Sequence, residues 1–298
     1  MSTMQTMFDV KPFIQLLVLS VAFPGFGQTA PRTQERSVER FENRIASLDH
    51  KFEDVTDSTQ KQLDAAGCPG NGRIDVCRRV ADDMMTAMNA IAADIHAEVD
   101  SFIRVAAASA PNQALDGTAV SNQLRRILPK GTDEAPSVFV GGAPDRRHLI
   151  AAYCLHKGTL MGSNGTSVTV RAYNQTANGM ALTDVTGDDM NGFGRLVVKA
   201  LRPRVADPAD SRTPATCLLL SGYMTGANGP LNRMRLYVYD GRQFHPVWMP
   251  EDVWGEFTVK ATANGFTVEG DYYRENRRRR DAYAVAETGV QLIAREAR

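Results

Sequence analysis

The sequence has little of what enzymes and nucleic-acid-binding proteins commonly display. Its 298 residues include only five histidines, four cysteines and two tryptophans. It contains no G-x-S-x-G elbow, H-E-x-x-H helix, Walker loop or G-x-G-x-x-G turn. Basic and acidic residues balance at 34 each, so no general positive field would attract nucleic acid or acidic lipid. These absences favour a non-enzymatic binding or interaction module, with a protein or polysaccharide as partner and no nucleic acid.

The sequence also lacks any apolar run of transmembrane length. The longest run, residues 13–23 (FIQLLVLSVAF), is much shorter than the roughly 20 residues that cross a bilayer. It follows Lys11 and precedes a proline and small residues, a pattern typical of a secretory signal peptide. We expect residues 1–30 to be removed by cleavage after Gly27 or Ala30, and the mature chain to be secreted or periplasmic. The alternative is an uncleaved membrane anchor.

Residues 31–106 carry two apolar stripes at helical spacing. The first stripe is Val38, Phe41, Ile45, Leu48, Phe52 and Val55, and the second is Val80, Met84, Met88, Ile91, Ile95, Val99 and Phe102. Alternating steps of three and four residues are typical of coiled-coil helices. Residues 67–72 (GCPGNG) between the stripes cannot be helical. The pattern therefore predicts an antiparallel helical hairpin.

The cysteines form two pairs along the chain. Cys68 and Cys77 flank the turn of the predicted hairpin, where a disulfide would stabilise the fold by up to about 3 kcal/mol. The alternative, a metal site, would need further ligands that the neighbouring sequence does not supply. Cys154 and Cys217 lie in comparable runs of the C-terminal half. A disulfide between them and a pair of buried thiols both fit the pattern.

Residues 107–136 read as a linker, and residues 137–298 as an antiparallel all-β domain, so the predicted fold class is α+β. Short β-branched and aromatic runs alternate with turn signals such as Asp240–Gly241. Residues 192–200 and 253–261 share the pattern aromatic-Gly-x-x-x-Val-Lys-Ala.

We interpret the shared pattern as an internal repeat of about 147–201 and 215–262. Each unit would be a four-stranded meander, and a hairpin would follow the second unit. The units would form a propeller-blade-like stack or a sandwich. The repeat predicts that Phe193 and Trp254, at equivalent places, are buried core aromatics.

The strongest candidate for a metal site is the acidic segment 184–192. Oxygen atoms of Asp184, Asp188 and Asn191, with Thr186, could surround a calcium ion. No other cofactor is expected. The competing interpretation is a solvated acidic turn.

Two further patterns point to different functions. The run Arg277, Arg278, Arg279 and Arg280 could bind a sulfated or phosphorylated polymer, or could belong to a solvated hairpin loop. A secreted hydrolase with a dispersed active site is the alternative function, with Asp184, Asp188, His148 and His245 as candidate residues.

Overall fold

The computed structural model describes residues 30–68, 70, 73–108, 116–129, 135–142, 147–160, 163–201, 216–226, 229–250, 254–262, 265–272, 277–286 and 289–297. Nearly all of the predicted signal peptide, residues 1–29, lies outside the described residues. Among the described helices, none is both long and apolar enough to cross a membrane.

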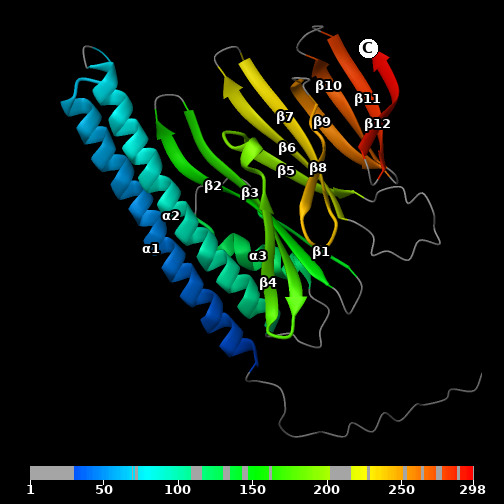
Figure 1. Cartoon of the computed structure of the whole chain (residues 1–298), viewed down its shortest axis with the longest axis horizontal. Coiled ribbons are helices and arrows are strands. Elements are labelled where there is room, and N and C mark those ends of the chain that lie inside the picture. Colours follow the sequence, from blue (N-terminus) through cyan, green and yellow to red (C-terminus); the bar gives the residue numbers. More distant parts are fainter. Residues whose placement is uncertain are drawn as a thin grey trace, which may run out of the picture.

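The predicted helical hairpin is confirmed. Helix α1 (Ala30–Ala65) and helix α2 (Ile74–Ala108) run side by side along one flank of the molecule (Figure 1). The two apolar stripes face each other: Phe41 and Ile45 on α1 are buried, as are Met88, Ile95 and Phe102 on α2. Two helices alone enclose only a thin core. Here the apolar residues of α2 also pack against residues of the first β strands, which enlarges the core.

A third helix lies inside the segment predicted as a linker. Helix α3 (Gly117–Ile127) begins after Asp116, whose side-chain carboxylate accepts a hydrogen bond from the backbone N–H of Thr118. Its buried side chains Val120 and Leu124 belong to the same core as the hairpin. The segment is therefore partly a packed element that joins the hairpin to the β half.

The described strands form three antiparallel four-stranded meanders. The first contains β1 (Ser137–Gly141), β2 (His148–Leu160), β3 (Ser163–Thr176) and β4 (Gly179–Thr186). A short 3₁₀ helix, η1 (Asp188–Met190), leads to the second: β5 (Gly194–Leu201), β6 (Thr216–Gly226), β7 (Gly229–Tyr239) and β8 (Phe244–Trp248). The third contains β9 (Trp254–Thr262), β10 (Gly265–Tyr272), β11 (Arg277–Ala286) and β12 (Gly289–Ala297).

The fold class is confirmed, but the meanders number three rather than two. Strand β5 hydrogen-bonds to β6, and β9 hydrogen-bonds to β10, so each strand begins a meander. The two segments with the shared aromatic-Gly pattern are therefore the first strands of the second and third meanders. The hairpin expected after the second unit, β11–β12, is part of the third meander.

The predicted β-hairpin around Asp240–Gly241 is confirmed. Tyr239 pairs with Phe244, and the turn holds Gly241 at a φ of 95°, a conformation that favours glycine. The backbone N–H groups of Arg242 and Gln243 both donate to the Asp240 carboxylate, which closes the turn. Strands β3 and β4 form a similar hairpin, in which Tyr173 pairs with Leu182.

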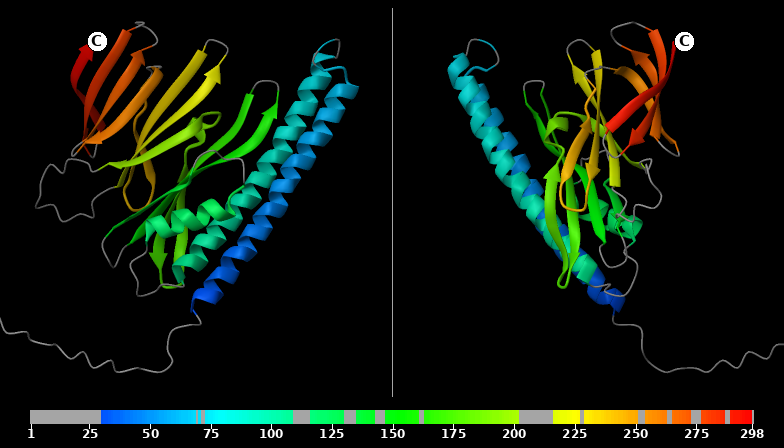
Figure 2. Two further views of the ribbon diagram at one scale, coloured as in Figure 1. Left: turned by 180° about the vertical axis from the view of Figure 1, so that it is seen from behind. Right: turned by 45° about the vertical axis from the view of Figure 1, so that its right-hand side comes forward.

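Three apolar cores separate four layers, which run from the helices through the successive meanders (Figure 2). Alternation along each inner strand places neighbouring residues in different cores. Examples are Phe102 and Leu149 in the first core, Ile150 and Leu218 in the second, and Leu219 and Phe266 in the third. The central strands of the first two meanders, β2, β3, β6 and β7, are therefore buried on both faces along much of their length.

The second and third meanders belong to one eight-stranded sheet, which divides at β7. The C-terminal part of β7 pairs with β8, whereas its Asn232 pairs with Trp254 at the start of β9. Since Asn232–Trp254 is the single β7–β9 pair among the described residues, the two meanders part beyond it. Phe193 is buried, as predicted. The Trp254 side chain lies outside the described residues.

Candidate functional site

The candidate calcium ligands point toward separate protein donors. The Asp184 carboxylate accepts a hydrogen bond from the backbone N–H of Phe244 on β8 at 2.6 Å. The Asn191 side-chain oxygen accepts one from the backbone N–H of Val168 on β3 at 2.8 Å. Asp188 is exposed at the start of η1. In the described part of the chain, no three His, Cys, Asp or Glu side chains gather to hold a metal ion, so the geometry gives the calcium hypothesis no support.

The four residues of the hydrolase alternative have different surroundings. His148 is buried between the first and second meanders, where its Nε2 lies 2.8 Å from the Thr216 hydroxyl. His245 is partly exposed on β8 and pairs with Asp240 at 3.0 Å. Asp184 is engaged by the β8 backbone. These hydrogen bonds give His148, His245 and Asp184 roles in joining strands and turns, and the structure offers no observation that favours a shared reaction centre.

His148 predicts a specific dependence of stability on pH. Burial lowers the pKa of His148, so the folded state favours the neutral imidazole. In the unfolded chain the imidazole protonates below about pH 6.5, so its contribution to stability is present above that pH and lost as pH falls. We expect His148→Gln to flatten the decrease in free energy of unfolding between pH 7 and pH 5, measured by urea titration. An unchanged slope would show that His148 does not set this dependence.

The arginine run forms the start of strand β11, so the interpretation of this run as a hairpin loop is wrong. Alternation separates its members: Arg279 is buried, Arg277 and Arg278 are exposed, and Arg280 is partly buried. Arg279 faces Asp281 at 2.8 Å and lies over the ring of Tyr272, 3.8 Å from its centre. A continuous basic surface for a sulfated polymer is therefore not formed by the four arginines, because the third is used inside the fold.

The cysteine pairs differ in the structure. Cys68 and Cys77 form the predicted disulfide across the turn of the helical hairpin, with their Cα atoms 6.0 Å apart. Cys154 and Cys217 are buried and are not joined by a disulfide. Cys154 faces the second core and Cys217 the third, on opposite faces of the second meander. The sequence allowed either a disulfide or two buried thiols at these positions, and the structure contains two buried thiols.

A buried polar network docks the helical hairpin on the first meander. Asp100 on α2 accepts two hydrogen bonds from the Arg171 guanidinium, at 2.8 and 2.6 Å, and one from the Tyr173 hydroxyl at 2.7 Å. One turn earlier, His96 lies 2.8 Å from the Tyr153 hydroxyl. Burial raises the pKa of both tyrosines, so the phenols stay neutral. This network is structural, because it fills the helix–sheet interface.

A second buried charge cluster lies in the third meander. The Asp281 carboxylate is fully buried and contacts Arg279 at 2.8 Å and Arg295 at 3.1 Å. The Tyr283 hydroxyl donates a further hydrogen bond to it at 3.0 Å. The two arginines come from β11 and from the last strand, β12. The cluster ties the outermost strand to the rest of the sheet.

A cavity lies where the second and third meanders part, and we call it the inter-meander cleft. It has a volume of about 410 Å³. Strands β5–β7 contribute Val197, Ser221, Gly222, Tyr223 and Asn232. Strands β9–β11 contribute Phe257, Thr258, Glu269, Gly270, Asp271 and Arg278.

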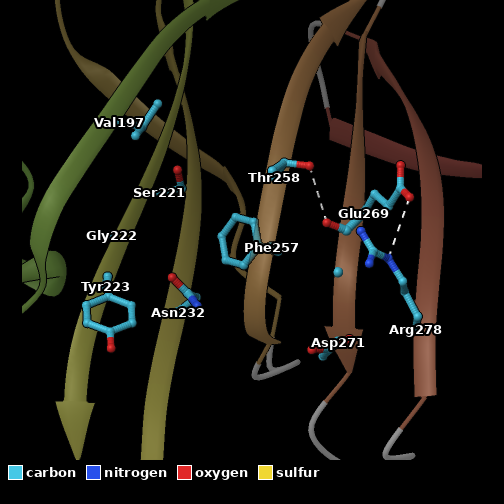
Figure 3. Close-up of a pocket in the computed structure, with 11 residues that line it drawn as sticks. Val197, Ser221, Gly222, Tyr223, Asn232, Phe257, Thr258, Glu269, Asp271 and Arg278 are labelled. Carbon is cyan, nitrogen blue, oxygen red and sulfur yellow. Dashed lines mark hydrogen bonds and ion pairs between the residues drawn. The ribbon is translucent and has the colours of Figure 1, made fainter.

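The cleft combines aromatic rings with hydrogen-bonding groups of both kinds. In Figure 3 the Phe257 ring projects from β9 toward the strands that carry Tyr223 and Asn232. Glu269 and Arg278 lie on the other side of that ring, 3.7 Å apart, and Asp271 is exposed nearby. The Asn232 amide donates to the backbone oxygen of Gly255, which holds the two meanders together at this end of the cleft.

The sequence interpretation did not identify the cleft. Tyr223 ends a run predicted as a strand, Phe257 begins another, and Asp271 lies beyond a third. None of these positions carries a local sequence motif. The three side chains come together only in the folded chain, where the sheet divides after Asn232. One available signal was Gly270, a glycine in the interior of β10 that pairs with Phe257 and adds no side chain beside it.

Comparison of the chain with protein-family models, curated proteins and solved structures finds no match. The geometry of the described residues therefore carries the functional argument.

Proposed function

We propose that this protein is an exported, non-enzymatic binding module that holds a small polar ligand in the inter-meander cleft. One observation carries the proposal: aromatic, amide and charged side chains from both meanders line one cavity of about 410 Å³. Ligand sites are typically concave, measure about 300–1,000 Å³ and join apolar walls to a few polar groups. The cleft has each of these properties.

Export is supported by two independent features. Residues 1–30 have the composition of a signal peptide, and Cys68 and Cys77 form a disulfide, which persists in oxidising compartments. A binding rather than a catalytic role is supported by the structural hydrogen bonds of Asp184 and His148, two of the four candidate catalytic residues.

The proposal predicts that ligands bind in the cleft and are not turned over. The full mature chain is screened by differential scanning fluorimetry against neutral oligosaccharides, amino acids, nucleotides, organic acids and choline. We expect one class to raise the melting temperature, because a ligand that binds the folded state alone stabilises it. Phe257→Leu should abolish this shift. Chromatography of the bound ligand after prolonged incubation should recover it unchanged.

Lys260→Ala is the matched control, since Lys260 is exposed on the same strand, β9, and does not line the cleft. It should keep the ligand-induced shift. A shift that survives Phe257→Leu would place binding elsewhere, and conversion of the ligand to product would favour the hydrolase alternative. If no class produces a shift, the binding function is wrong.

A further inference from the structure

We infer that the ligand of the inter-meander cleft is a neutral saccharide, with one sugar ring stacked on Phe257. This inference rests on the proposed binding function and adds the chemical class of the ligand. It follows from the shape of the cleft, its aromatic surface and the balance of its charges.

The aromatic groups suit the apolar face of a sugar. Phe257 and Tyr223 lie on opposite meanders and line the same cavity. Both residues are only partly buried, and Phe257 packs against the edge of the third core, which holds its ring beside the cavity. A pyranose ring presents axial C–H groups on a flat face, and the electron-rich face of an aromatic ring packs favourably against such groups. Gly270 pairs with Phe257 across β9 and β10 and adds no side chain to fill the space beside it.

The polar groups suit hydroxyls, which both donate and accept hydrogen bonds. The Asp271 carboxylate is an acceptor, the Arg278 guanidinium is a donor, and the Thr258 hydroxyl is both. Asp271 and Arg278 are exposed and pair across β10 and β11, so acceptor and donor stand side by side at the rim. Adjacent hydroxyls of a sugar can donate a hydrogen bond to Asp271 and accept one from Arg278. A ligand that has only hydrogen-bond donors or only acceptors cannot do both.

The charges argue against an anionic ligand. Among the described lining residues, Arg278 is the one basic group, and its Nε lies 3.7 Å from the Glu269 carboxylate. Asp271 adds a second acidic group. A phosphate or sulfate would therefore meet more negative than positive charge among the described lining residues, which include no cluster of arginines that would bind it. A neutral ligand avoids this repulsion, and the exposed Asp271 carboxylate can remain in contact with water beside it.

A quaternary ammonium cation is the competing ligand class, because aromatic faces and carboxylates also recognise cations. The neutral saccharide is favoured because the Arg278 guanidinium and the Thr258 hydroxyl of the lining can donate hydrogen bonds, and a quaternary ammonium group has no acceptor to receive them. The comparison of these two classes is built into the experiment.

The test is isothermal titration calorimetry of the full mature chain with maltotetraose, cellotetraose, xylotetraose and chitotetraose, and with choline as the cationic probe. We expect at least one tetrasaccharide to bind with a dissociation constant between about 1 µM and 1 mM. Phe257→Leu, which keeps an apolar side chain but removes the flat ring, should weaken binding at least tenfold. Asp271→Asn should weaken it several-fold, and Lys260→Ala should leave it unchanged.

Three results would overturn the saccharide inference. The first is binding of a tetrasaccharide with equal affinity by Phe257→Leu and the unaltered protein. The second is Phe257-dependent binding of choline without any tetrasaccharide, which would retain the proposed binding function but change the ligand class. The third is the absence of binding by every probe here and in the wider ligand screen, which would overturn both proposals. Circular dichroism of Phe257→Leu verifies that lost binding does not reflect lost folding.

Discussion

Replacing Asp281 with alanine is expected to destabilise the protein by about 3–5 kcal/mol, the usual cost of removing one partner from a buried ion pair. The Asp281 side chain has no solvent exposure, and that of Arg279 is 2% exposed. The substitution leaves the Arg279 guanidinium in the third core without the carboxylate at 2.8 Å. Arg295 is 46% exposed, so water can solvate its guanidinium after the substitution. The loss of the Arg295–Asp281 ion pair therefore contributes less to the destabilisation. Urea titration followed by circular dichroism measures the change.

Two further variants make the measurement decisive. Asp271→Ala, one strand away on β10, removes an exposed carboxylate and should change the free energy of unfolding by less than about 0.5 kcal/mol. The double variant Arg279→Met/Asp281→Leu removes both buried charges and should recover much of the loss, because apolar residues of similar volume often replace a buried pair without cost. Equal losses from Asp271→Ala and Asp281→Ala would show that burial of this pair does not matter.

The helices and hairpins were predictable because their signals are local. The apolar stripe from Val38 to Val55 indicates one face of a helix, and Asp240–Gly241 indicates one turn between two strands. The partner of β5 was not predictable in this way. Alternation along residues 194–201 fits pairing with β4 or with β6 equally well, and the choice of β6 depends on how whole meanders pack.

The buried charges show a second limit of sequence interpretation. Arg279, Asp281, Tyr283 and Val285 alternate along β11 and share the inward face, but a run of four arginines is usually solvated. The charge run, which is equally typical of a solvated loop, conceals this alternation in the sequence. Arg171 presents the same case, since it occupies an inward position between Thr169 and Tyr173. A charged residue at an inward position of a strand predicts a buried partner, which only the fold identifies.

The Asp100–Arg171 pair should be the main polar determinant of how the helical hairpin docks. Asp100→Ala removes the acceptor of three hydrogen bonds and leaves the Arg171 guanidinium, 9% exposed, without its carboxylate. Asp100 itself is 24% exposed, so we expect a loss near the lower end of the range for buried pairs, about 3 kcal/mol. Asp94→Ala, at an exposed position of the same helix, should change stability by less than about 0.5 kcal/mol.

Hydrogen exchange and a double-mutant cycle distinguish loss of docking from general destabilisation. Because Asp100 joins α2 to β3, exchange in Asp100→Ala should accelerate first in 95–108 and in the facing part of β3, while β9–β12 keep their protection. The cycle of Asp100→Ala and Arg171→Ala should give a coupling energy of about 2 kcal/mol, since each substitution alone already breaks the pair. Additive losses, or exchange that rises equally in all three meanders, would mean that apolar packing of Phe102 and Ile95 alone holds the hairpin in place.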